Sequence, residues 1–192
     1  MAAVIGQHLI ENKIAKPKLQ VLIYPILQFY DFTLPAYRVN MPKKVLGQIS
    51  YENYKNFIHY LTGYEADDSI FLNGHTTRSH KESIFSEYVN VGYLPNKFRK
   101  NHNLESIKFA NDTQEVYKKV SEILLSKELS PLLVKDEHLL NNTPNHTVLI
   151  TTEMDILRDD GFIYAGRLKK LGLSIQHEHY QNLFHGVFGM SF

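Results

Sequence analysis

Apolar positions along the chain follow two different periods, and together these predict a protein of mixed strands and helices. Two runs, Leu19 to Leu27 and Thr147 to Thr152, are almost continuously β-branched or aliphatic, as strands buried on both faces of a parallel sheet are. Pro25 should end the first strand or lie at its exit, because proline cannot donate a hydrogen bond to a neighbouring strand. A third segment, Leu173 to Tyr180, alternates as a strand does, with His177 and His179 on one side.

The spacing of apolar residues predicts a helix between the last two strands. The helix is expected from about Arg158 to Leu171, with Gly172 as its C-terminal stop. Its apolar positions are Ile163, Tyr164, Leu168 and Leu171. The order strand, helix, strand predicts a βαβ unit with a right-handed crossover, and therefore an α/β fold. A further amphipathic helix is expected over Met1 to Asn12, with Ala2, Ile5, Leu9 and Ile10 near its buried face.

A long helical insertion is expected from about Phe32 to Asn145. Ser50 can cap a helix whose apolar positions are Tyr54, Phe57, Ile58 and Leu61. Asp112 and Glu115 have the spacing of a capping box ahead of a second helix. Gly63 to His80 is mixed and polar, and we expect a loop there. Aromatic residues of the insertion are expected in the core of its helices rather than in contact with a substrate; they include Tyr51, Tyr54, Phe57 and Tyr60.

Composition narrows the possible functions. The 192 residues carry a formal net charge of +1 with no long block of one sign, so a nucleic-acid partner or an anionic membrane surface is not expected. The absence of cysteine excludes disulfides and cysteine nucleophiles. The longest strongly apolar run, Val21 to Leu27, is far shorter than the roughly 18 residues of a membrane-spanning helix.

Two titratable residues follow the last two strands. Asp155 comes directly after the strand at Thr147 to Thr152, and His185 follows the final strand. The carboxyl ends of parallel strands meet at one edge of the sheet, which is where open α/β sheets place their ligands. An acid followed by a histidine is the second half of the order serine, acid, histidine found in hydrolases. Asp155 and His185 are therefore the candidate catalytic residues.

The residues around this pair resemble a known family. Met154 to Tyr164 (MDILRDDGFIY) and Phe184-His185-Gly186 are similar to the acid and histidine motifs of arylacetamide deacetylase-like proteins, in the hormone-sensitive-lipase group of α/β-hydrolases. Leu22 to Gln28 (LIYPILQ) and Ser130-Pro131-Leu132-Leu133 add to the likeness. The resemblance implies an incomplete α/β-hydrolase: residues 1–31 a helix and a strand, 32–145 a cap-like insertion, and 146–192 the strand–helix–strand unit with the acid and the histidine.

By this resemblance the intact protein would hydrolyse small apolar carboxylic esters and arylamides with a serine, aspartate and histidine triad, and would need no cofactor or metal. The family also implies an endoplasmic reticulum membrane location with a lumenal catalytic domain, and a role in lipid metabolism. Three N-x-T sequons, at Asn111, Asn141 and Asn145, are compatible with such a location. The relatives often carry a cysteine where this chain has Thr152, so a disulfide from that strand is not expected.

The nucleophile motif of this fold, G-x-S-x-G, and its HGGG-type oxyanion loop do not occur in the 192 residues. Both ends of the sequence lie in apolar segments, so we expect the chain to be a fragment, the second half of a hydrolase. On its own it should lack esterase activity. The alternative is a non-catalytic truncated product that at most binds lipids or a partner.

Two other groups of residues have structural interpretations. Asp159 and Asp160 fall in the first turn of the helix after Asp155, where negative charge complements the helix dipole. His177 and His179 could pair on a metal ion, but no third ligand has recognisable spacing, so packing or surface roles are expected.

Overall fold

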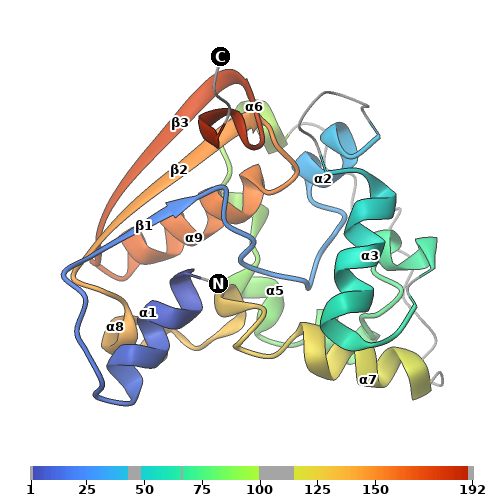
Figure 1. Cartoon of the computed structure of the whole chain (residues 1–192), viewed down its shortest axis with the longest axis horizontal. Coiled ribbons are helices and arrows are strands. Elements are labelled where there is room, and N and C mark those ends of the chain that lie inside the picture. The colour runs from blue at the N-terminus through green and yellow to red at the C-terminus, as the bar shows by residue number, and fades with distance from the viewer. Residues whose placement is uncertain (1, 43–48, 66, 100–114, 190–192) are drawn as a thin grey trace.

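A computed structural model describes residues 2–42, 49–65, 67–99 and 115–189 (Figure 1). It contains a three-stranded parallel sheet in the order β1-β2-β3. The strands are β1 (Leu19–Ile23), β2 (His146–Met154) and β3 (Ser174–Phe184). The α/β class and the βαβ unit are thus confirmed, with α9 (Arg158–Lys170) joining β2 to β3.

The first strand is shorter than the sequence pattern predicts. It ends at Ile23, and Tyr24 adopts a left-handed backbone with φ +50°. Pro25 therefore lies just beyond the strand, at its exit. The third strand is longer than predicted and continues to Phe184, directly before His185.

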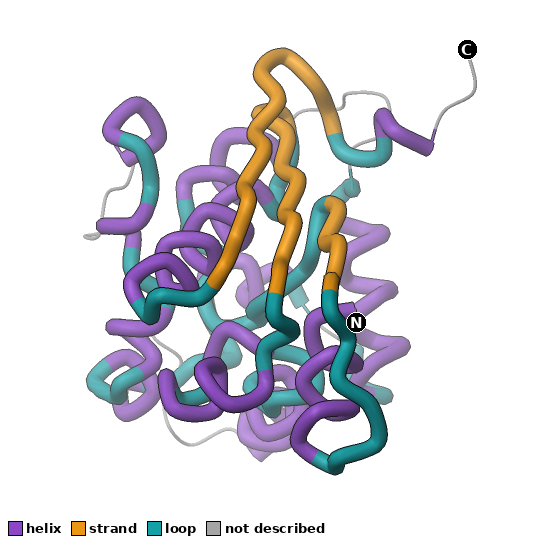
Figure 2. Tube along the Cα trace, turned by 90° about the vertical axis from the view of Figure 1, so that its left-hand side faces the viewer, coloured by secondary structure: helices purple, strands orange, loops and turns teal. Residues whose placement is uncertain are grey.

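Figure 2 shows the three strands side by side, with the helices gathered mostly behind and below them. Helix α9 covers one face, where Leu22 and Leu149 are paired in register and fully buried. In α9 the predicted Ile163, Tyr164 and Leu168 are all buried. On the other face, Leu19, Val21 and Ile23 remain about half exposed.

Helix α1 (Ala2–Glu11) occupies its predicted position, but the face expected to be buried is wrong. Ala3, Gly6 and Gln7 are buried, whereas Ile5 is exposed. Close packing explains the difference, because a Cβ on Gly6 would lie 3.2 Å from both Gln20 Oε1 and Pro144 Cγ. Small residues let the helix approach the sheet, and the larger Ile5 turns outward.

The segment between β1 and β2 is rich in short helices. They are α2 (Pro35–Asn40), α3 (Tyr51–Thr62), η1 (Asp68–Leu72), α4 (Arg78–Lys81), α5 (Phe85–Tyr88), η2 (Val91–Tyr93), α6 (Asn96–Arg99), α7 (Glu115–Leu124), η4 (Pro131–Leu133) and α8 (Asp136–Asn142). Ser50 caps α3 as predicted, accepting the N–H of Asn53 at 3.1 Å. The expected loop at 63–80 instead contains η1 and the start of α4. The predicted Asp112 and Glu115 capping box lies outside the described side chains.

An aromatic cluster connects these helices to the sheet. Phe32 packs edge-on against Tyr37 and Tyr54 at 5.5 Å between ring centroids, and Tyr54 is 1% exposed. The expectation of a core position is wrong for Tyr60, which is 84% exposed, and Tyr51 and Phe57 are only partly covered, at 40% and 38% exposed. Among the helices in the described part of the chain, none has the length and apolar character needed to cross a membrane.

Candidate functional site

The predicted acid and base lie together at the carboxyl edge of the sheet. Asp155 follows β2 and is 1% exposed, and His185 follows the neighbouring β3. His185 Nδ1 lies 3.1 Å from Asp155 Oδ1. The Asp155 side chain also accepts the N–H of Leu157 at 2.9 Å, which fixes the carboxylate at the turn leading into α9.

The Asp155–His185 contact is close, but its geometry is not that of a hydrogen bond. Within the described residues, neither His185 Nδ1 nor Asp155 Oδ2 has a hydrogen-bond partner. A buried donor and a buried acceptor left unpaired are each unfavourable. The two atoms belong to side chains that already face each other, since Nδ1 lies 3.1 Å from the other carboxylate oxygen, Oδ1. Catalytic hydrogen bonds are often long or poorly aligned before substrate binds.

Asn40 holds the backbone at the acid. This residue of α2 is 2% exposed, and its amide donates to the carbonyl oxygens of Asp155 at 3.0 Å and Glu153 at 3.3 Å. The end of β2 is therefore tied to the insertion across more than a hundred residues of sequence. Sequence reasoning missed Asn40, because nothing in its local pattern indicates a contact so distant along the chain.

A pair of stacked aromatic rings lies beside the base. The Tyr24 ring lies 5.0 Å from that of His185 and is stacked on Phe188 at 5.7 Å, centroid to centroid. Burial raises the pKa of Tyr24, and the Asp155 carboxylate adds to this effect. In the sequence, Tyr24-Pro25 is only part of a motif that carries the family likeness, and the fold brings the tyrosine beside the histidine.

Asp159 and Asp160 lie in the first turn of α9 and have structural roles, as predicted, but these roles include buried hydrogen bonds that the sequence does not indicate. Both are 0% exposed. Asp159 accepts the N–H of Ala36 at 2.7 Å and pairs with Arg158 at 2.8 Å. Asp160 accepts from the N–H of Leu27 at 3.2 Å and from Gln28 Nε2 at 3.0 Å. They anchor the segment after β1 to α9.

His177 and His179 share a face of β3, as the alternation predicts, and pack against the Phe162 ring. Thr151 Oγ1 lies 2.9 Å from His177 Nε2 and 3.0 Å from His179 Nδ1. Within the described residues, no group of three or more histidine, cysteine, aspartate or glutamate side chains could hold a metal ion. Burial lowers the pKa of each histidine to about 4, which suits a packed neutral imidazole.

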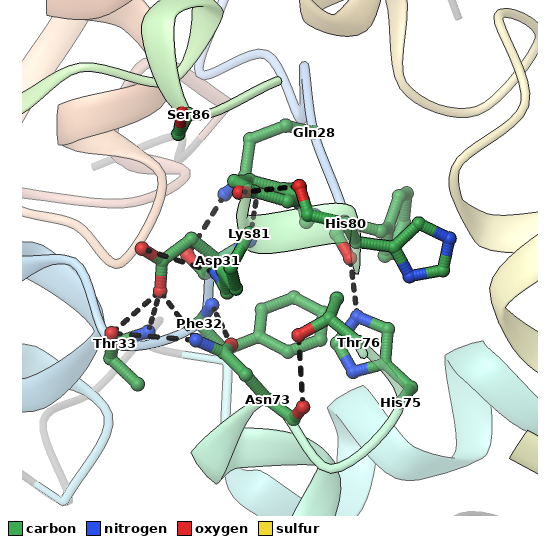
Figure 3. Close-up of polar contacts among 12 residues, drawn as sticks. Gln28, Asp31, Phe32, Thr33, Asn73, His75, Thr76, His80, Lys81 and Ser86 are labelled. Carbon is green, nitrogen blue, oxygen red and sulfur yellow. Dashed lines mark hydrogen bonds and ion pairs between the residues drawn. The ribbon is translucent and has the colours of Figure 1, made fainter. Parts of the chain in front are cut away.

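A second buried polar cluster lies away from the Asp155–His185 pair (Figure 3). Asn73 donates to Asp31 at 2.8 Å and accepts the N–H of Phe32 at 2.8 Å. Lys81 lies 3.7 Å from Asp31. Burial alone would raise the pKa of Asp31, but Lys81 and the hydrogen bonds from Thr33 and Asn73 hold it below its usual value. These bonds tie the segment after β1 to 73–81, which is a structural role.

No family model matches the chain. Arylacetamide deacetylase of Bos taurus is 35% identical over 198 residues, which cover 100% of this chain and 47% of that protein. Neutral cholesterol ester hydrolase 1 of Rattus norvegicus is 32% identical over an alignment that covers 97% of this chain and 45% of that protein. The chain is a homologue of the arylacetamide deacetylases. The chain spans about half the length of these curated relatives and corresponds to their C-terminal part.

Solved structures agree on the fold. An esterase of Rhizomucor miehei superposes with a TM-score of 0.57 at 19% identity, covering 96% of this chain and 40% of that one. A carboxyl esterase of Tuber melanosporum superposes with a TM-score of 0.54 at 15% identity, covering 98% of this chain and 42% of that one. The deacetylase homologue thus has the fold of an incomplete α/β-hydrolase, and its relatives are ester hydrolases.

Proposed function

We propose that this chain supplies the acid and the base of a serine ester hydrolase, with Asp155 as the acid and His185 as the general base. The observation that carries the proposal is the 3.1 Å contact between His185 Nδ1 and Asp155 Oδ1, at the carboxyl ends of two adjacent parallel strands. The homology to ester hydrolases supports it independently.

In this proposal the two residues divide the chemistry. The Nε2 atom of His185 takes the proton of a serine hydroxyl and returns it to the leaving group. Asp155 keeps the other ring nitrogen protonated and stabilises the imidazolium that forms. Its almost complete burial, at 1% exposure, strengthens this electrostatic effect because water screens the carboxylate little.

The nucleophile has to come from elsewhere, since G-x-S-x-G does not occur in the 192 residues. We therefore propose that the isolated chain is inactive and that activity requires a polypeptide segment carrying the serine and the oxyanion hole. A fluorophosphonate probe tests the first half of this statement. We expect no covalent labelling of the isolated chain; rapid labelling of one of its serines would contradict it.

The proposed substrates are small apolar esters or amides. A hollow of about 650 Å³ lies between α2, α3 and η1. The aromatic part of its wall, which includes Phe32, Tyr51 and Phe71, supports this choice, although Arg38, Glu52, Lys55 and Asp68 also line it. Helix α2 also holds the acid in place through Asn40. The names of the relatives indicate arylacetamides and cholesterol esters, and both are cleaved by the same acyl-transfer chemistry. A lumenal location in the endoplasmic reticulum and a role in lipid metabolism remain predictions from the resemblance.

A fusion protein tests the triad. The part of the Bos taurus arylacetamide deacetylase that this chain does not cover is joined to residues 1–192, and hydrolysis of a chromogenic short-chain ester is measured. We expect His185→Ala to lower kcat on the order of 10⁶-fold and Asp155→Asn to lower it about 10⁴-fold. His59→Ala, an exposed histidine on α3, is the matched control and should leave kcat unchanged. Equal activity of the parent and the His185→Ala fusion would overturn the proposal.

A further inference from the structure

Tyr24 has an unusual backbone for a residue with a large side chain. Its φ of +50° lies in the left-handed region, which favours glycine. Its N–H nevertheless donates to the carbonyl of Ile150 at 3.1 Å, so this conformation is fixed at the end of the β1–β2 ladder. Residues held in sparsely populated conformations cluster at functional sites when the surrounding structure determines them. The conformation of Tyr24 directs attention to what its side chain contacts.

The Tyr24 side chain contacts the loop of the base in three ways. Its ring lies 5.0 Å from the His185 ring at an interplanar angle of 46°. It is stacked on the Phe188 ring at 5.7 Å and 11°. Its hydroxyl oxygen accepts the backbone N–H of Phe188 at 3.2 Å. One side chain thus contacts both the imidazole and the main chain three residues beyond it.

The loop has little else to hold it among the described residues. Gly186 turns the chain with φ +85°, and Phe188 is 50% exposed. Tyr180 adds one edge-to-face contact with Phe188 at 5.3 Å. On the other side of His185, Asp155 makes a short but poorly aligned contact. The orientation of the imidazole therefore depends on the two groups that flank it, the carboxylate and the Tyr24 ring.

We propose that Tyr24 is a positioning residue for His185. Its ring limits rotation of the imidazole away from Asp155, and its hydroxyl fixes the loop through the Phe188 N–H. This inference rests on the proposed function, since it assigns Tyr24 a role through the base. Tyr24 itself does not contact the reacting atoms.

Nuclear magnetic resonance on the full 192-residue chain tests the role directly. Tyr24→Phe keeps the ring and removes the hydroxyl, whereas Tyr24→Asn removes the ring but tolerates the left-handed backbone. Tyr60→Phe, on an 84% exposed residue, is the matched control. The two measurements are hydrogen exchange of the Phe188 amide and the ¹⁵N signals of the His185 ring, which report the tautomer.

For Tyr24→Phe we expect exchange of the Phe188 amide to become about two- to tenfold faster, the factor that the net strength of one hydrogen bond supports, with the His185 tautomer unchanged. For Tyr24→Asn we expect His185 to change from a single tautomer protonated at Nδ1 to an average of both. Unchanged His185 signals in Tyr24→Asn would overturn the proposal, and so would changes spread over the whole chain or reproduced by Tyr60→Phe. These signals do not depend on catalysis, so failure of the triad in the fusion assay is a separate result.

Discussion

Asp160 illustrates how a residue in a helix's first turn can face the protein interior. Burial raises its pKa from 3.8 to about 8, and Asp159 and Asp155 add to the increase, against the hydrogen bonds from Gln28 and Leu27. The folded protein therefore holds a proton that the unfolded chain has lost above about pH 4. Because the folded state binds more protons in this interval, stability falls as the pH rises from about 4 to about 8.

Asp160→Asn removes this ionisation while it keeps the shape of the side chain. The amide of the variant cannot accept both hydrogen bonds that the carboxyl accepts, a loss that does not change with pH. We therefore expect the unfolding temperature of the variant, relative to that of the parent, to rise from pH 4 to pH 8, because only the parent loses stability through the ionisation of this side chain. Thermal unfolding followed by circular dichroism between pH 4 and 9 measures the difference. Asp68→Asn, at an exposed position, is the control and should not reproduce it. A parent whose stability rises steadily over this range relative to Asp160→Asn would contradict the assignment.

Gly161 is a second residue whose role depends on close approach. It lies inside α9, where a Cβ would be 2.3 Å from Thr151 Cγ2 and 3.1 Å from Leu149 Cδ2. Alanine favours an exposed helix by about 1 kcal/mol over glycine. Overpacking of this kind costs about 1–3 kcal/mol, and the contact with β2 leaves little room to relax.

We therefore expect Gly161→Ala to lower the free energy of unfolding, measured by urea titration, although helix propensity alone predicts the opposite. Thr151→Ser removes the methyl group that the new Cβ meets. The loss of stability caused by Gly161→Ala should therefore be smaller in the Thr151→Ser background than in the parent chain. A gain in stability on Gly161→Ala in the parent would show that α9 lies farther from the sheet.

At the scale of elements, the βαβ unit was predictable because its periods are strong and local. The apolar run of β2, the helical spacing of α9 and the alternation of β3 each specify an element, and short connections make them neighbours. The fold of the insertion was less predictable. Leu27 and Gln28 bond to Asp160 across more than 130 residues, and Asn40 bonds to Asp155 across 115. No local pattern contains such contacts.

The candidate site also has a part that the sequence predicts and a part that it does not. Asp155 and His185 were identified from their position after strands and from motifs, and the structure brings them together. Asn40, which binds the backbone at this pair, carries no sequence signal of its own, and Tyr24 stands in a motif of the family likeness that does not indicate a place beside the histidine. Their side chains reach the site only because β1 and α2 lie beside β2 in space.

The packing of β3 on α9 gives a pH-dependent stability. Burial lowers the pKa of His177 and of His179 to about 4 from an ordinary value of 6.5. Each is kept neutral in the folded state, so their contribution is fully present above about pH 6.5 and is lost as the pH falls toward 4. Lys97, Lys169 and Arg158 add to this effect, while Glu153 and Glu178 oppose it.

For the double variant His177→Gln/His179→Gln we expect a smaller loss of stability than the parent shows between pH 6.5 and 4.5. The quantity to compare is the difference in unfolding free energy between variant and parent at each pH, since Asp160 acts in the opposite direction. His59→Gln, on the exposed side of α3, controls for the loss of a titrating residue. A difference that stays constant with pH would mean that the two imidazoles are protonated as easily in the folded chain.

For the whole molecule, the sheet has one covered and one open face. Leu19, Val21 and Ile23 are 54%, 46% and 48% exposed, and by the alternation of β1 they lie on the face opposite the buried Leu22. β1 is also an edge strand, so its outer backbone groups have no partner strand within the described sheet. Parallel sheets are usually covered on both faces, and an apolar edge of this kind promotes association between chains.

We expect the 192-residue chain to self-associate through this face as its concentration rises. Val21→Lys places a charge in the middle of the exposed row without touching the buried Leu22, and it should shift sedimentation at a given concentration toward the monomer. Tyr60→Lys introduces the same charge at a more exposed aromatic residue away from the sheet, and it should leave sedimentation unchanged. If the parent chain sediments as a monomer at all concentrations, or if both variants act alike, the open face of β1 is not the surface through which chains associate.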